Sequence, residues 1–173
     1  MMNRFVIADA SKCIGCRTCE IACAMSHSDK SLGEMTTSQF ASRLKVIKTN
    51  TITMPVMCRQ CDNAPCANAC PTGALFREND SIQVIQARCI GCRSCEVVCP
   101  FGAMTIRTEK TAHDIQAKAL KCDLCSDNPQ GPACVRVCPT KAITLVYPDS
   151  LDDQIKRRQQ QTALGQLNAF LPS

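Results

Sequence analysis

Sixteen cysteines in four groups of four, with none left over, constrain this chain of 173 residues more than any other feature. In chain order the groups are Cys13, Cys16, Cys19 and Cys23; Cys58, Cys61, Cys66 and Cys70; Cys89, Cys92, Cys95 and Cys99; and Cys122, Cys125, Cys134 and Cys138. Groups one and three have the spacing C-x2-C-x2-C-x3-C. Groups two and four keep C-x2-C and C-x3-C-P at their ends but widen the gap between these pairs to four and eight residues.

The spacing of groups one and three predicts iron–sulfur ligation. It is the cysteine motif of bacterial ferredoxins, in which three thiolates bind one cluster and the fourth cysteine binds the neighbouring cluster. Sixteen thiolates, at four for each cubane, predict four 4Fe–4S clusters. Gly15 and Gly91 lie in the tight CIGC turns, where a side chain is expected to crowd backbone that approaches the cluster.

Two other uses of cysteine fit the sequence less well. A disulfide scaffold belongs to secreted chains, but the first residues carry one basic side chain and an apolar run too short for a signal peptide. Structural zinc sites draw C-x2-C pairs from separate knuckles and do not use three cysteines so close together. No apolar run approaches the ~18 residues of a membrane span, so the chain is expected to be cytoplasmic.

The segments between the groups indicate an α+β fold. ALFRE and SIQVI, joined at Asn79-Asp80, predict a hairpin between groups two and three, and AMTIRT predicts a strand after group three. FVIAD before group one and AITLVY after group four predict two strands that lie side by side, as the first and last strands of a ferredoxin do. We therefore expect a duplicated bacterial-ferredoxin-like fold, with one ferredoxin half inserted in the other, stabilised by four clusters.

The predicted domains and ligand sets follow from this pairing. Residues 1–50 and 111–148 form the outer half with groups one and four, residues 51–110 the inserted half with groups two and three, and residues 149–173 a C-terminal helical tail. Each set takes three cysteines from one group and the last cysteine of its partner group. The predicted sets are Cys13, Cys16, Cys19 with Cys138; Cys122, Cys125, Cys134 with Cys23; Cys58, Cys61, Cys66 with Cys99; and Cys89, Cys92, Cys95 with Cys70.

Group one lacks the proline that follows the other three groups. Pro71, Pro100 and Pro139 have no backbone N–H and are expected to stop a short helix. Ala24 permits the helix to continue through AMSH into an insertion, before LKVIKT resumes strand-like alternation. Alternatively the proline is optional at this place, and a helix that ends at Cys23 would indicate that.

Basic residues accompany the cysteine groups. The formal charge of +5 falls to roughly −3 if each of four clusters contributes about −2. The residues concerned are Lys12, Arg88 and Lys121, which directly precede a group, and Arg17 and Arg93, which lie in the tight loops. They are expected either to offset cluster charge or to form a solvated basic face. Basic and aromatic residues are not interleaved, so nucleic-acid binding is not expected.

The two histidines and the tail carry weaker signals. His27 and His113 are expected at the surface or beside the ligands, because the cysteines already fill every ligand position. The tail, DSLDDQIKRRQQQTALGQLNAFLPS, predicts a helix capped by Asp149 or Ser150.

Several motifs together resemble a known family. KCIGCRTCE, APCANACP, PFGAM and KCDLCS with QGPACVRVCPTKA are similar to the four-cluster iron–sulfur electron-transfer subunits of molybdopterin oxidoreductases, closest to the formate hydrogenlyase and hydrogenase-4 iron–sulfur components and HydN-like electron transport proteins. This resemblance covers residues 2 to about 147. Larger relatives have a long insertion before group four and membrane-bound relatives a C-terminal anchor. This chain has neither, which favours a short HydN-like member.

The resemblance implies a non-catalytic role. No nucleophilic triad, phosphate loop or dinucleotide fingerprint occurs, and clusters with four cysteine ligands leave no open iron. The expected function is electron transfer between a molybdopterin-dependent catalytic subunit of the formate dehydrogenase type and a hydrogenase or other redox partner. A free polyferredoxin carrier and an accessory or maturation factor remain alternatives.

Overall fold

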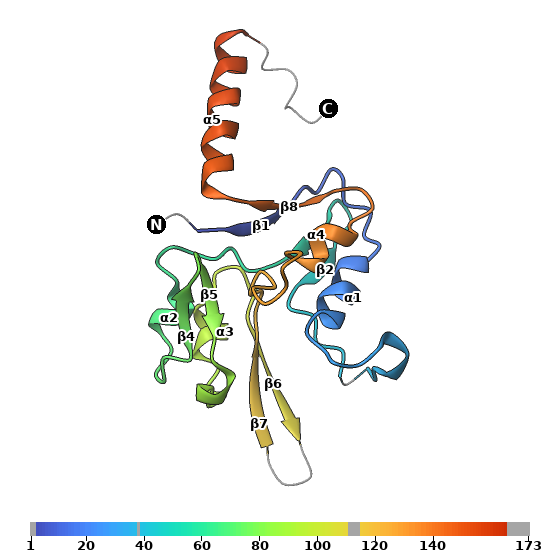
Figure 1. The fold of residues 1–173 in the computed structure, drawn as a ribbon, viewed down its shortest axis with the longest axis vertical. Coiled ribbons are helices and arrows are strands. Elements are labelled where there is room, and N and C mark those ends of the chain that lie inside the picture. Colours follow the sequence, from blue (N-terminus) through green and yellow to red (C-terminus); the bar gives the residue numbers. More distant parts are fainter. Residues whose placement is uncertain (1–2, 38, 111–114, 166–173) are drawn as a thin grey trace.

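The computed structural model describes residues 3–37, 39–110 and 115–165, and shows an α+β fold of short strands and helices (Figure 1). In chain order the elements are β1 (Phe5–Ala8), α1 (Thr18–Met25), η1 (Leu32–Glu34), β2 (Lys45–Lys48), β3 (Thr53–Val56), α2 (Pro65–Asn68), β4 (Leu75–Glu78), β5 (Ser81–Val84), η2 (Gln86–Arg88), α3 (Ser94–Val98), β6 (Thr105–Lys110), β7 (Ile115–Leu120), α4 (Ala133–Val137), β8 (Ile143–Val146) and α5 (Pro148–Ala163).

The strands pair as antiparallel ribbons, two of which the sequence predicts. β1 pairs with β8, with Phe5 opposite Val146, so the first and last strands lie side by side as expected. β4 and β5 form the expected hairpin. Its turn residues Asn79 and Asp80 have φ values of 46° and 58°, the left-handed geometry that two-residue hairpin turns need.

The other two ribbons contain strands that the sequence analysis does not predict. The expected strands LKVIKT and AMTIRT form β2 and β6. Each of them pairs with the strand that follows it, β3 or β7, and so forms a local hairpin. The segment before group four is therefore a strand of a hairpin that projects from the body of the molecule (Figure 1).

The order of elements over residues 5–78 recurs over residues 81–146: strand, cysteine group with helix, hairpin, second cysteine group with helix, strand. Two equivalent hydrogen bonds mark the repeat. Glu20 Oε1 accepts the Val46 N–H at 2.6 Å, and Glu96 Oε1 accepts the Ile106 N–H at 2.5 Å. Each glutamate directly follows the third cysteine of its group and ties a cysteine-bearing helix to the first strand of the next hairpin.

Two small cores hold the repeats together, and cysteines contribute to both. The first core contains Val6, Cys19, Cys23, Leu44, Val46, Met57, Leu124, Cys134 and Ile143. The second contains Ala64, Leu75, Ile82, Cys95, Met104, Ile106 and Ala119. The first joins the start of the chain to group four, and the second joins groups two and three.

The helix of group one differs from the others as the missing proline predicts. α1 continues past Cys23 to Met25. In contrast, α3 and α4 stop at Val98 and Val137, and the cysteine that follows each has an extended backbone. With Ala24 in place of a proline, the helix of group one continues to Met25 before the segment that leads to β2.

The C-terminal helix begins earlier than expected. The sequence predicts a cap at Asp149 or Ser150, but α5 starts at Pro148, with Tyr147 as its N-cap. Ser150 Oγ accepts the Tyr147 N–H at 3.1 Å from inside the first turn. No residue of α5 is buried, and the helix projects from the β1–β8 ribbon (Figure 1). Among the described residues, no helix combines the length and apolarity needed to cross a membrane.

The tight turns of groups one and three require glycine for a reason beyond cluster access. Gly15 and Gly91 have φ values of 71° and 73°. A Cβ on Gly15 would lie 2.6 Å from Thr53 Cγ2, and a Cβ on Gly91 would lie 2.7 Å from Ala117 Cβ. Both turns are therefore packed against the second strand of a hairpin, β3 or β7.

Replacing Gly91 by alanine should destabilise the iron-loaded protein by roughly 2–4 kcal/mol, because it adds left-handed strain and a clash with Ala117. Guanidinium unfolding followed by circular dichroism measures this. Gly102→Ala is the matched control, since its φ is 58° but nothing lies within 4 Å of an added Cβ. An equal loss in the two variants would contradict the packing argument.

Candidate iron–sulfur sites

Four helices bring the cysteine groups together in two pairs. Each group has its third cysteine in a helix, and its fourth cysteine in the same helix or within two residues of its end. α1 packs against α4, and α2 packs against α3. Group one therefore lies beside group four, and group two lies beside group three.

Two cavities are each lined by three cysteines of one group and one of the partner group. The cysteines of the first are Cys13, Cys16, Cys19 and Cys138. Those of the second are Cys70, Cys89, Cys92 and Cys95. The space free of protein atoms, including that open to solvent, is about 320 Å³ in the first and about 350 Å³ in the second.

The remaining cysteines also influence one another electrostatically, and for Cys134 and Cys61 the largest thiolate contributions come from members of the predicted sets. Burial raises the pKa of Cys134, and the thiolates of Cys122, Cys23 and Cys125 add to the rise, with a smaller contribution from Cys19. Burial likewise raises the pKa of Cys61, with contributions from Cys58 and Cys99. Buried thiols of this kind bind a metal only with loss of their protons.

The cysteine sulfurs are not gathered closely in threes. In a tetrahedral zinc site with Zn–S bonds of ~2.3 Å, the sulfurs lie about 3.8 Å apart. Within the described part of the chain, the one trio of potential ligand atoms that all lie within 4.8 Å of one another is His27, Asp123 and Cys125. No three cysteine sulfurs of these residues lie that close together.

Hydroxyl groups lie against two sulfurs of each cavity. Thr18 Oγ1 donates to Cys16 Sγ at 3.3 Å, and Thr140 Oγ1 lies 3.7 Å from Cys138 Sγ. In the second cavity, Thr72 Oγ1 lies 3.6 Å from Cys70 Sγ, and Ser94 Oγ lies 3.5 Å from Cys92 Sγ. The hydrogen bond from Thr18 lowers the pKa of Cys16 and so favours its thiolate, the form that binds iron.

The residue before the second cysteine has a positive φ in every group. Gly15 and Gly91 adopt this geometry freely, whereas Gln60 and Leu124 have φ values of 51° and 62°. A side chain in the left-handed region costs roughly 1–2 kcal/mol. Leu124 offsets that cost by its place in the first core. Gln60, which is 1% exposed, makes buried hydrogen bonds instead.

The five basic residues near the cysteines separate into two classes. Lys12, Arg17, Arg88 and Arg93 are exposed, and Arg17 and Arg93 also line the two cysteine cavities. Lys121 is 2% exposed.

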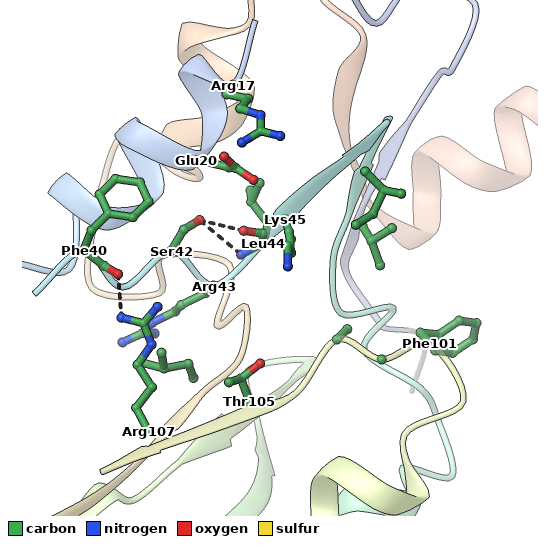
Figure 2. A pocket seen from close by; sticks show the side chains of 15 residues that line it. Arg17, Glu20, Phe40, Ser42, Arg43, Leu44, Lys45, Phe101, Thr105 and Arg107 are labelled. Carbon is green, nitrogen blue, oxygen red and sulfur yellow. Dashed lines mark hydrogen bonds between the residues drawn. The ribbon is translucent and has the colours of Figure 1, made fainter. Parts of the chain in front are cut away.

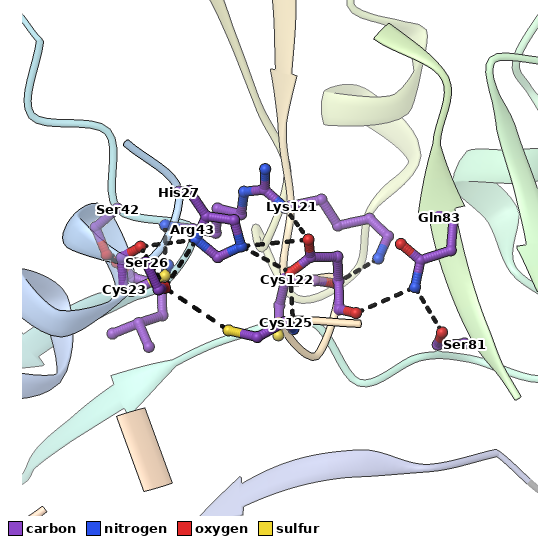
Figure 3. Close-up of polar contacts among 12 residues, drawn as sticks. Cys23, Ser26, His27, Ser42, Arg43, Ser81, Gln83, Lys121, Cys122 and Cys125 are labelled. Carbon is purple, nitrogen blue, oxygen red and sulfur yellow. Dashed lines mark hydrogen bonds and ion pairs between the residues drawn. The ribbon is translucent and has the colours of Figure 1, made fainter. Parts of the chain in front are cut away.

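An ion network that the sequence does not reveal surrounds Asp123, inside the C-x2-C pair of group four; Figure 3 shows His27 and Arg43, two of its members. His27 Nε2 lies 3.0 Å from Asp123 Oδ1, and Arg43 pairs with the other carboxylate oxygen. Burial opposes ionisation of Asp123, but the hydrogen bond from His27 and the charge of Arg43 hold its pKa well below the usual range. The backbone N–H of Arg43 also donates to Cys23 Sγ at 3.3 Å. His27 thus lies beside the ligands, whereas His113 is outside the described residues.

A larger cavity opens beside α1, with Arg17, Glu20, Lys45 and Arg107 among the residues that line it (Figure 2). Its space free of protein atoms, including that open to solvent, is about 1240 Å³. Arg107 donates to the Phe40 carbonyl across this space. The lining contains no cysteine, although Arg17 also lines the group-one cavity.

Known proteins are similar to this chain over nearly its whole length. Residues 49–147 match the 4Fe-4S dicluster domain, and residues 10–26 match a 4Fe-4S binding domain. The chain is 46% identical to the electron transport protein HydN of Escherichia coli (strain K12), with 94% of this chain and 99% of HydN covered. From the same organism, hydrogenase-4 component A is 39% identical (94% and 91% covered) and formate hydrogenlyase subunit 2 is 37% identical (98% and 96% covered).

These matches extend over nearly the whole of each relative, and the iron–sulfur interpretation of the cysteine groups agrees with them. The chain belongs to the family of 4Fe–4S electron transport proteins that includes HydN, hydrogenase-4 component A and formate hydrogenlyase subunit 2.

Proposed function

We propose that this protein is a non-catalytic electron-transfer subunit that holds four 4Fe–4S clusters. Each cluster is named after the group that supplies three of its ligands. The group-one cluster takes Cys13, Cys16, Cys19 and Cys138; the group-two cluster Cys58, Cys61, Cys66 and Cys99; the group-three cluster Cys89, Cys92, Cys95 and Cys70; and the group-four cluster Cys122, Cys125, Cys134 and Cys23.

The observation that carries this proposal is the pair of cavities lined by three cysteines of one group and one of its neighbour. The neighbours of Cys134 and Cys61 support the other two sets in the same way. Sixteen cysteines supply four complete sets with no remainder.

The finer description of the fold rests on the same pairing. We propose an outer ferredoxin-like half over residues 1–50 and 111–148, an inserted half over 51–110, and a helical tail over 149–173. The two separate cores support this division, because one draws on groups one and four and the other on groups two and three. The repeated element order supports a duplication.

The residues of the chain have three tasks in this function. When bound, each cluster supplies one-electron chemistry at iron that is fully ligated by cysteine. The thiolates hold it, and the hydroxyls of Thr18, Thr72 and Thr140 stabilise charge on the sulfurs. Each site also contains a buried cysteine that keeps water from one side of it: Cys19, Cys58, Cys95 and Cys134.

We propose that the partners are a molybdopterin-dependent catalytic subunit of the formate dehydrogenase type and a hydrogenase, and that the protein works in the cytoplasm. The names of two relatives, hydrogenase-4 component A and formate hydrogenlyase subunit 2, support this assignment. A free polyferredoxin, or an accessory factor that assists maturation of such an enzyme, are the alternatives.

Anaerobic affinity purification of the tagged protein from its native cell, followed by mass spectrometry, tests the partner assignment. We expect stoichiometric recovery of a molybdopterin catalytic chain or a hydrogenase, because a dedicated conductor needs a stable interface with its redox partner. An untagged strain is the control. Recovery of the protein alone, or with many substoichiometric enzymes, would favour a free carrier.

The ligand sets predict a crossed effect of Cys23→Ser. This change lies in group one, but it should remove about four irons from the group-four cluster and leave the group-one cluster in place. Cys138→Ser should have the opposite effect. EPR spectra of the reduced variants measure this, with Cys16→Ser and Cys125→Ser as references for the group-one and group-four signals. Loss of the group-one signal in Cys23→Ser would contradict the crossed ligation.

A further inference from the structure

Lys121 carries a buried positive charge at the junction of the two halves. Its ammonium donates to the carbonyl of Cys122 at 2.5 Å and to Gln60 Oε1 at 3.3 Å (Figure 3 shows the first contact). Lys12 occupies the same place before group one, but its side chain is 60% exposed and pairs with Asp9. A charge inside protein acts on its neighbours far more strongly than one in water.

Gln60 connects group two to group four. Its backbone N–H donates to Cys58 Sγ at 3.4 Å, and its Nε2 donates to the Cys122 carbonyl at 2.7 Å. Its Oε1 accepts both the Ile82 N–H at 2.8 Å and the Lys121 ammonium. Gln60 has a positive φ, and the equivalent residues of groups one and three, Gly15 and Gly91, are glycines.

The repeat shows that neither residue is needed for packing alone. Met57 precedes group two as Lys121 precedes group four, and Leu124 precedes the second cysteine of group four as Gln60 does in group two. Met57 and Leu124 are both buried in the first core. The counterpart of the Lys121–Gln60 pair is therefore apolar, and the fold accommodates apolar side chains at both positions.

The charge of Lys121 acts on cysteines of both groups. Burial raises the pKa of Cys66 in group two, and the Lys121 ammonium opposes the rise. Burial also raises the pKa of Cys122 in group four to about 12, opposed by the Leu124 N–H and by Lys121, while the Cys58 thiolate adds to the rise. The hydrogen bonds of Gln60 to Cys58 and to Cys122, and of Lys121 to Gln60 and to Cys122, place the Lys121 ammonium beside both groups.

We propose that Lys121, held in place by Gln60, raises the reduction potentials of the group-two and group-four clusters together. This shared effect eases electron transfer between the two halves. The inference rests on the proposed four-cluster function. A fixed cation stabilises the more negative, reduced state of each neighbouring cluster and lessens the repulsion between them. In the step concerned, one electron leaves the reduced cluster of one half and enters the oxidised cluster of the other, and no bond or proton moves.

EPR-monitored redox titration of the full-length, iron-loaded protein tests this. Lys121→Met, which copies Met57, should shift the potentials of the group-two and group-four clusters to more negative values and leave the other two unchanged. Gln60→Glu should cause the same shift, because a carboxylate beside Lys121 cancels its charge. Lys12→Met is the matched control and should shift none of the four, because water screens its charge.

Iron content separates the possible failures. A wild-type chain that binds fewer than four clusters would contradict the proposed function itself. If Lys121→Met and Gln60→Glu keep four clusters with unchanged potentials, or shift all four alike, the proposal for Lys121 is overturned while the function stands. If Lys121→Met loses iron, the cluster potentials measured for Gln60→Glu test the proposal in its place. Loss of iron in both would assign the pair a structural role and also overturn the proposal.

Discussion

The sharing of cysteines between neighbouring groups, which we propose for all four clusters, is the constraint on which the rest of the structure depends. Each of the two cysteine-lined cavities combines three cysteines of one group with the last cysteine of its neighbour. The packing of α1 on α4 and of α2 on α3 brings these neighbouring groups together. Because the apolar cores are small and themselves contain cysteine, metal binding must supply much of the folding free energy.

The two repeats contain the same order of elements, but the side chains beside their cysteine groups differ. Glu20 and Glu96 make equivalent bonds from helix to hairpin. Around the second and fourth groups the symmetry fails, because one side has the apolar residues Met57 and Leu124 and the other has Lys121 and Gln60. Near-identical ligand sets can therefore differ in potential through charges and hydrogen bonds that do not touch iron.

Local patterns in the sequence predict much of this arrangement. Cysteine spacing indicates the sites, alternation predicts β1, β4, β5 and β8, and the Asn79-Asp80 pair predicts the turn of a hairpin. The strand β7 is missed, although Ile115, Ala117 and Ala119 alternate with polar residues, because alanine gives a weak apolar signal. The α5 cap is misplaced because Ser150 bonds from inside the first turn.

Contacts between distant residues could not be predicted in the same way. Burial of Lys121, and not of Lys12, depends on how distant segments, such as the one that carries Gln60, cover it, and cysteine spacing does not encode this. The ion pair between Arg43 and Asp123 joins residues 80 apart. This ion pair also holds the segment between α1 and β2 beside group four.

The pairing of β1 with β8 has a consequence for how the protein is made. Phe5 faces Val146, so β1 finds its partner strand only after residues 143–146 have been synthesised. The β4–β5 ribbon, by contrast, closes within ten residues. Residues of the second core, which ends at Ala119, are made before β8, and closure of the long loop between β1 and β8 is slow. The middle of the chain can therefore mature first, while the thiols nearest the N-terminus wait longest for protection and stay open to oxidation during translation.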